Sequence, residues 1–226
     1  GALEWNTFLG GSDSAALAVD ANGDAYLAAS ANHPLSGWGE PVVPLHGNRD
    51  VVVAKLSTTG APLWNTFVGG AGNDYRRAVS VDAVGAVYLA GGSEVSWGTP
   101  VAPYAGTGGW VAKLDTAGQV QWNTFVGATG VQRTYGVSQL ALDAGGRPYV
   151  AGTSYATWGT PVRPYSGSAD VYVAALETNG TFRWNTFLGG SGGDESKGIG
   201  VDAAGGVFVA GNSTAPWGAP LAGSSG

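Results

Sequence analysis

Cysteine is absent from this chain of 226 residues. Its absence excludes a disulfide framework and thiolate chemistry. Charged residues are scarce, at 12%, and the ten Lys and Arg residues are spread along the chain among sixteen Asp and Glu, with Arg76 and Arg77 the one adjacent pair. A net charge of −6 without a basic cluster argues against nucleic acid and anionic lipid as partners.

Long apolar runs are also missing. None approaches about 18 residues, so we expect no segment of the chain to insert into a membrane. What the chain has in abundance is glycine, with 40 residues, together with an apolar content of 44%. That balance is typical of a compact protein of short strands and tight turns, and disorder needs the opposite balance.

The most informative feature is the sequence Trp-Asn-Thr-Phe, because it occurs four times at intervals of about 60 residues. The copies are Trp5–Phe8, Trp64–Phe67, Trp122–Phe125 and Trp184–Phe187. A fixed period of this size indicates a propeller or another repeat array. One repeat family runs through the whole chain, so we expect a single domain over residues 1–226. Its approximate repeats are residues 12–67, 71–125, 129–187 and 191–226, the last completed by residues 1–11.

Each repeat shows four short apolar segments separated by turns. In the second repeat these are Ala78–Asp82, Val87–Ala90, Trp110–Leu114 and Trp122–Phe125. The pattern predicts an all-β fold, a β-propeller of four-stranded antiparallel blades. Asp opens the first turn of every repeat, and six residues later an aromatic residue follows that we expect to pack between blades. These acids are Asp20, Asp82, Asp143 and Asp202, and the aromatic residues are Tyr26, Tyr88, Tyr149 and Phe208.

The turn acids have two interpretations. An Asp at the start of a turn caps its own backbone, which is the interpretation we favour. Calcium binding is the alternative, but calcium needs six or more converging oxygens, and each acid here stands beside an apolar Ala.

Three sequence features together resemble the SBBP repeats, a bacterial β-propeller family. They are the run Asn185–Ser191, the turn Val201–Gly205 and the Val-Ala-Lys-Leu segment Val53–Leu56. The resemblance covers essentially the whole chain. It implies a propeller fold and an extracellular location on the bacterial cell surface, and it carries over no catalytic residue. The glycine-rich link of residues 127–132 departs from the pattern because it lacks the Asp of the other links.

A long loop in each repeat carries Trp-Gly-X-Pro. The four tryptophans are Trp38, Trp97, Trp158 and Trp217. One hypothesis is that these indoles form a lectin-like site and stack on sugar rings. The other is that each indole folds back and closes its own loop onto the blade, with Gly and Pro shaping the turn. We favour the second hypothesis and keep carbohydrate binding as the alternative function.

Residues suited to catalysis are few. His33 and His46 lie in one loop without a third ligand at a known metal-site spacing. Asp194 and Glu195 are adjacent on an extended segment, so they point to opposite sides, which is poor geometry for acid–base chemistry. The chain is therefore expected to be non-enzymatic, with no metal site and no cofactor.

The two ends of the chain suggest how a ring closes. The C-terminal repeat has its first two strands, and the N-terminus begins at a fourth strand, so we expect both ends to form one closing blade that lacks its third strand. The exposed edges would include Leu3, Trp5 and Thr7 on one side and Val207, Val209 and Gly211 on the other. Such edges invite another β-strand. The hypothesis is a structural or assembly module that self-associates or accepts a partner strand; an excerpt from a longer array is the alternative.

Overall fold

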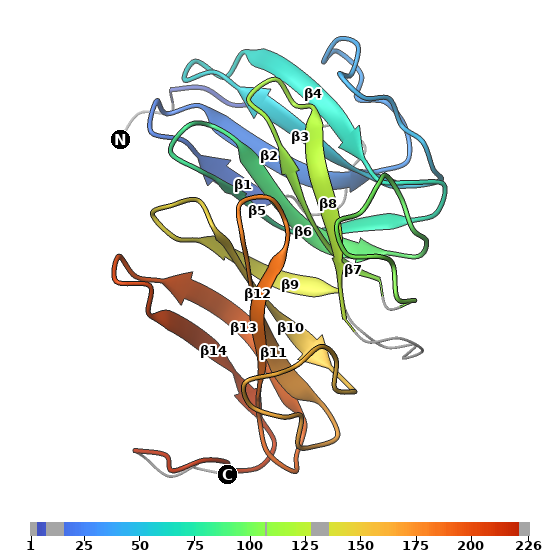
Figure 1. Ribbon diagram of the computed structural model, residues 1–226. Coiled ribbons are helices and arrows are strands. Elements are labelled where there is room, and N and C mark those ends of the chain that lie inside the picture. Colours follow the sequence, from blue (N-terminus) through green and yellow to red (C-terminus); the bar gives the residue numbers. More distant parts are fainter. Residues whose placement is uncertain (1–3, 8–15, 107, 128–135, 222–226) are drawn as a thin grey trace.

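The computed structural model describes residues 4–7, 16–106, 108–127 and 136–221 (Figure 1). These residues form fourteen β-strands and no helix. The first sheet contains β1 (Ala16–Val19), β2 (Ala25–Ala31), β3 (Asp50–Leu56) and β4 (Pro62–Val68). The second contains β5 (Asp74–Val81), β6 (Val87–Ser93), β7 (Gly109–Leu114) and β8 (Val120–Val126). The third contains β9 (Val137–Leu142), β10 (Pro148–Ser154), β11 (Asp170–Leu176) and β12 (Phe182–Leu188). The fourth contains β13 (Asp194–Val201) and β14 (Val207–Ser213).

Every sheet is an antiparallel meander, with its strands in chain order. The first strands of successive sheets contact one another, β1 with β5, β5 with β9 and β9 with β13. The sheets therefore follow one another as repeated units along an inner row of first strands. The expected all-β architecture of four-stranded antiparallel sheets is confirmed.

Closure into a propeller ring is not seen among the described residues. Trp5 packs on the first sheet, where its indole Nε1 donates a 2.9 Å hydrogen bond to the carbonyl of Thr58. In Figure 1 the N-terminal end and the β13–β14 pair lie at opposite ends of the row of sheets. The predicted slot between the N-terminal strand and β14 is therefore not formed by the described residues. Leu3, one of its predicted edge residues, lies outside the described residues.

The junction between neighbouring sheets is built the same way each time. The fourth-strand indoles of Trp64 and Trp122 donate to the carbonyls of Thr116 and Thr178 in the β7–β8 and β11–β12 turns, at 3.1 and 2.9 Å. Each indole lies over a glycine of that turn, such as Gly118, whose φ of 83° favours glycine. Each repeat therefore needs its successor to cover its fourth strand.

Of the second-strand aromatics, Tyr26 packs between sheets as predicted, whereas Phe208, which was predicted to do the same, is 64% exposed. Tyr26 meets Trp64 edge-to-face at 6.1 Å, and it shares a buried cluster with Val87 and Leu89 of the second sheet. The turn acids cap their own turns: Asp82 Oδ1 accepts hydrogen bonds from the backbone of residues 84 and 86, and Asp20, Asp143 and Asp202 do the same. Strand β5 begins at Asp74, four residues before the predicted Ala78, because Asp74 already pairs with Ser93, and β13 likewise begins at Asp194, which pairs with Ser213 and stands four residues before the corresponding Gly198.

Candidate functional site

The loop tryptophans are held against their own sheets. Trp38 and Trp97 are buried, Trp158 is half-buried and Trp217 is 38% exposed. The side-chain amides of Asn65, Asn123 and Asn185 in the fourth strands each donate a 2.9 Å hydrogen bond to the carbonyl of the loop Trp in the same sheet. In these three copies of Trp-Asn-Thr-Phe, the Asn therefore holds the long loop of its sheet in place through this hydrogen bond.

A sugar-stacking site needs an indole face that is open to solvent. Trp97 instead meets Trp110 and Phe125 edge-to-face, at 5.3 and 6.3 Å between ring centroids. Trp158 meets Tyr172 in the same way at 5.4 Å. These contacts favour the interpretation in which each indole closes its own loop. Trp217 is more exposed because it follows β14, next to which no third strand lies among the described residues.

The residues considered for catalysis do not form a constellation. His33 and His46 are both exposed, and His33 Nδ1 lies 3.0 Å from its neighbour's carbonyl, that of Pro34. Asp194 is buried whereas Glu195 is exposed and paired with Lys197 at 2.8 Å, so the two acids do point apart. No group of three or more His, Cys, Asp or Glu side chains converges within the described part of the chain.

The clearest polar site is a pocket of about 460 Å³ between the starts of the first strands, which we call the axial pocket. All four sheets contribute to it. Its lining residues are Ser30, Arg49, Tyr75, Arg76, Arg77, Ser138, Gln139, Glu195, Ser196 and Lys197. Two hydrogen bonds join the sheets across it: the backbone N–H of Arg76 donates to Ser30 Oγ at 3.1 Å, and Ser196 Oγ donates to Gln139 Oε1 at 2.8 Å.

A β-bulge places one pocket residue in each of three sheets. The pairing of β5 with β6 shifts at Arg77, that of β9 with β10 at Ser138, and that of β13 with β14 at Lys197. Each of these residues stands five positions before the turn acid of its repeat. A bulge bends the strand and re-aims the extra side chain, and such bulges are common beside functional sites.

The axial pocket concentrates positive charge. Arg49, Arg76, Arg77 and Lys197 are four of the ten basic residues of a chain whose net charge is −6, and Glu195 is the acid in the lining. The guanidinium of Arg49 lies 5.3 Å from the ring centroid of Tyr75, an arrangement that holds the cation in place. Burial, and then the neighbouring charge of Arg77, lowers the pKa of Arg76. The sequence alone did not indicate this site, because its cations come from three separate segments.

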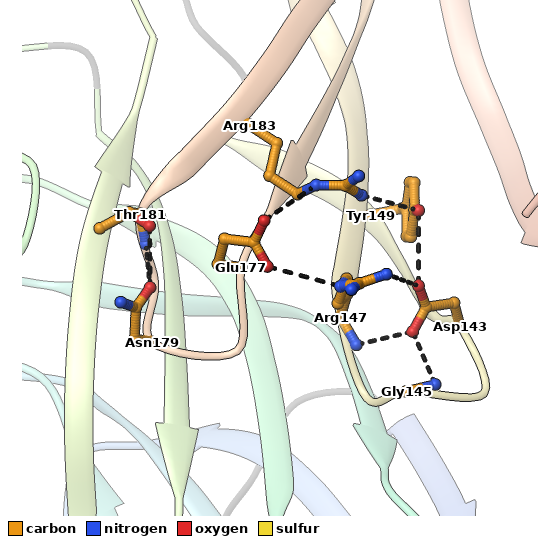
Figure 2. A network of polar contacts seen from close by, with 8 residues as sticks. All are labelled: Asp143, Gly145, Arg147, Tyr149, Glu177, Asn179, Thr181 and Arg183. Carbon is orange, nitrogen blue, oxygen red and sulfur yellow. Dashed lines mark hydrogen bonds and ion pairs between the residues drawn. The ribbon is translucent and has the colours of Figure 1, made fainter.

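A second network of charged residues lies in the third sheet, and we interpret it as structural rather than as a binding site. In the third sheet Glu177 pairs with Arg147 and Arg183, and Arg183 also donates to Tyr149 Oη at 3.2 Å (Figure 2). In the first two sheets the corresponding cation is a lysine of the third strand, Lys55 or Lys113, which Ala175 replaces here. In the third sheet, Arg183 of the fourth strand β12 thus takes the place of the third-strand lysine (Figure 2).

The second distinctive surface is the edge and face of β14. Among the described residues β14 pairs with β13 alone. Phe208 is 64% exposed, whereas its counterparts Tyr26, Tyr88 and Tyr149 are buried. Val209 and Gly211 lie beside Trp217 in a small groove along the same strand. In the other sheets a third strand pairs with the equivalent edge, and among the described residues β14 has no such strand.

Comparison with known proteins adds no relative to these observations. No protein-family model matches the chain, and no curated protein is significantly similar to it. The described residues contain no helix that is long and apolar enough to cross a membrane.

Proposed function

We propose that this chain is a non-enzymatic structural module of the bacterial cell exterior that assembles by adding β-strands of another repeat unit to β14. The observation that carries the proposal is Phe208, an exposed aromatic at a position that the other three sheets bury. Backbone pairing would supply affinity, and the aromatic contact would supply specificity. The extracellular location follows from the resemblance to SBBP repeats.

The other sheets indicate what the added strands look like. In the first sheet β3 pairs with β2 through register-matched apolar residues, and β4 then brings Trp64 against Tyr26. A partner for β14 therefore needs an apolar third strand followed by a fourth strand with an indole. The repeats of this chain contain such a pair of strands, so another repeat unit is the occupant that fits.

A synthetic peptide covering residues 48–68 tests this proposal, because it carries β3 and β4. We expect the peptide to bind the chain and to raise its Tm. The same peptide with Trp64→Ala should bind about fivefold more weakly, since an aromatic pair contributes about 1 kcal/mol. Phe208→Ser in the chain should weaken binding similarly. No binding by the parent peptide, together with a concentration-independent monomer in sedimentation, would contradict the proposal.

A second candidate function is binding of an anionic ligand, such as an acidic glycan, in the axial pocket. The lining, with four cations and one acid, favours it over neutral glycans on the loop tryptophans. A glycan array should then show acidic sugars bound in a salt-dependent way. Arg77→Ser should abolish the signal, and Arg183→Ser, which changes a cation outside the pocket, should leave it intact. Equal binding by both variants would remove this candidate.

A further inference from the structure

Two buried carboxylates face each other at the link between the first and second sheets. Asp50 begins β3 and Asp74 begins β5, and both are fully buried. One oxygen of each is occupied: Asp50 Oδ2 accepts from the backbone N–H of His46 at 2.7 Å, and Asp74 Oδ2 accepts from that of Gly70 at 2.9 Å. The other oxygens, Asp50 Oδ1 and Asp74 Oδ1, are buried and have no hydrogen-bond partner among the described residues.

Backbone glycines allow these carboxylates to approach each other. A Cβ placed on Gly69 would lie 2.8 Å from Asp50 Oδ1 and 2.5 Å from Asp74 Oδ2, so both acids reach the same point. The carbonyl oxygens of Gly70 and Gly72 converge on Gly47, where a Cβ would also lie 3.0 Å from Asp50 Oδ1. Asp50 Oδ1 is thus close to both points, with Asp74 Oδ2 beside the first and two carbonyl oxygens beside the second.

The same arrangement recurs between the third and fourth sheets. Asp170 Oδ2 accepts from the backbone of Ser166 at 2.8 Å, and Asp194 Oδ2 accepts from that of Gly190 at 3.0 Å. Their Oδ1 atoms are again buried and without a hydrogen-bond partner in the described part of the chain. A Cβ on Gly189 would lie 2.9 Å from Asp170 Oδ1 and 2.5 Å from Asp194 Oδ2.

Where the chain has both positions, the two acids are present together at two junctions and absent together at the third. In the second sheet Gly108 stands where the other two have Asp50 and Asp170, and the following link, residues 127–132, contains no acid. If each Asp only capped its own loop, one would be expected without the other. Joint presence and joint loss indicate that both acids serve one shared ligand.

The residues that lead to the second acid of each pair, Asp74 or Asp194, follow a sequence pattern known from calcium-binding repeats. Residues 69–74 read Gly-Gly-Ala-Gly-Asn-Asp and residues 189–194 read Gly-Gly-Ser-Gly-Gly-Asp. Gly-Gly-X-Gly-X-Asp is also the order found in the nonapeptide repeats of parallel β-helices that bind Ca²⁺. In both settings the glycines leave the backbone carbonyls accessible beside the acid.

We propose that Asp50 with Asp74, and Asp170 with Asp194, each bind one Ca²⁺ ion between neighbouring sheets. Calcium takes six to eight oxygen ligands, and carboxylates, backbone carbonyls such as those of Gly70 and Gly72, and water supply them. An ion would also neutralise two buried negative charges, which are costly when uncompensated.

The two sites differ in their neighbouring charges, and the guanidinium of Arg163 is present only beside the second. Arg163 Nη2 donates a 2.7 Å hydrogen bond to the carbonyl of Gly189, beside the second pair of acids. Val43 occupies the corresponding position in the first sheet, as shown by the matching bonds from Phe67 to Val43 and from Phe187 to Arg163. The positive guanidinium opposes a second cation, so the Asp50–Asp74 site is the tighter of the two. The proposal does not depend on the assembly function.

Terbium luminescence and thermal unfolding test the proposal at pH 7.5 after treatment with EDTA. Trp97 adjoins the first site, since its Cβ lies 2.6 Å from where Gly70 would carry a Cβ, so its indole can sensitise a bound Tb³⁺. We expect Tb³⁺ emission that saturates at two equivalents per chain and is displaced by Ca²⁺, and a Tm that rises with Ca²⁺. Asp74→Asn should remove one equivalent, and Asp74→Asn with Asp194→Asn should remove both.

The control is Asp82→Asn, which changes a turn acid of the same sheet and should retain both equivalents. The effect of Asp74→Asn should also reverse in sign: in EDTA the variant is at least as stable as the parent, and in Ca²⁺ it is less stable. A parent chain that shows neither Tb³⁺ emission nor a Ca²⁺-dependent Tm overturns the proposal. Emission that survives unchanged in the double variant places the ion elsewhere and overturns it too.

Discussion

The third and fourth sheets are built from the same repeat, yet they expose equivalent positions very differently. Tyr149 in β10 is buried beside Trp184 and Arg183 of β12 in its own sheet, whereas Phe208 in β14 is 64% exposed. Trp158 is half-buried in its loop and Trp217 is exposed. The residue types are similar, so the difference comes from the strands around them. Burial of the second strand depends on the third and fourth strands of its sheet.

This comparison explains why the repeats act together. A fourth-strand Trp is covered by the turn of the following sheet, and a second-strand aromatic is covered by that Trp. No repeat can bury these residues alone, and stacking of neighbours produces a continuous core, as in other repeat proteins. The last sheet shows what remains when the neighbour's strands are not there.

Truncating the second-strand aromatic gives the largest expected effect. Tyr88→Ala should reduce the free energy of unfolding by about 3–5 kcal/mol, as for other fully buried aromatic side chains. Phe208→Ala should cost under about 0.5 kcal/mol, because most of the ring is in water. Urea titrations of both variants measure the difference. Equal losses would mean that Phe208 is buried in solution, either by self-association or by closure of a ring.

The fourth-strand tryptophans give a second comparison between a sheet that is covered by a neighbouring turn and one that is not. Trp122 docks on the turn at Thr178, but β12 has no such following turn for Trp184 among the described residues. Trp122→Ala is therefore expected to cost about 3 kcal/mol and Trp184→Ala about 1 kcal/mol less, since the second variant loses no inter-sheet hydrogen bond or turn contact. Chemical unfolding followed by far-UV circular dichroism tests the order. A larger loss for Trp184→Ala would contradict it.

Removing the amide that fastens the long loop should have an intermediate effect. Asn123→Ala deletes the 2.9 Å hydrogen bond to the carbonyl of Trp97 and leaves that buried carbonyl without its partner, at a cost of about 1–2 kcal/mol. The loop should then open enough for acrylamide to quench Trp97. Gln121→Ala, a change at an exposed position of the same strand, is the control. Unchanged quenching in Asn123→Ala would show that packing alone holds the loop.

The sequence predicted the features that depend on local geometry. Strand alternation, the Asp-capped turns and the aromatic six residues after each Asp are encoded within a dozen residues, and the structure has all three. The axial pocket is different. Arg77 and Lys197 enter it through bulges, and a bulge depends on how the first strand registers with the second. The periodicity of apolar residues along the sequence does not show the register in which two strands pair.

Two further features depend on contacts between distant segments. The starts of β5 and β13 at Asp74 and Asp194 are fixed by pairing with Ser93 and Ser213, so the glycine-rich composition before them concealed the first four residues of each strand, including the two buried acids. Ring closure depends on the rotation from one sheet to the next, accumulated over all sheets. Sequence similarity between the two ends could not establish it.

The smallest expected difference separates the second sheet from the third. Lys113 is mostly buried, 3.8 Å from Asp82 and 4.9 Å from the Tyr88 ring centroid, whereas the Glu177 network of Figure 2 is largely exposed. Lys113→Met should cost about 1 kcal/mol through the lost cation–π contact and ion pair. Glu177→Gln should cost under about 0.5 kcal/mol, and this loss should disappear in 1 M NaCl, where exposed charges are screened. Unfolding in low and high salt measures both. A salt-independent loss above about 1 kcal/mol for Glu177→Gln would mean that the exposed network holds the third sheet as firmly as the buried lysine holds the second.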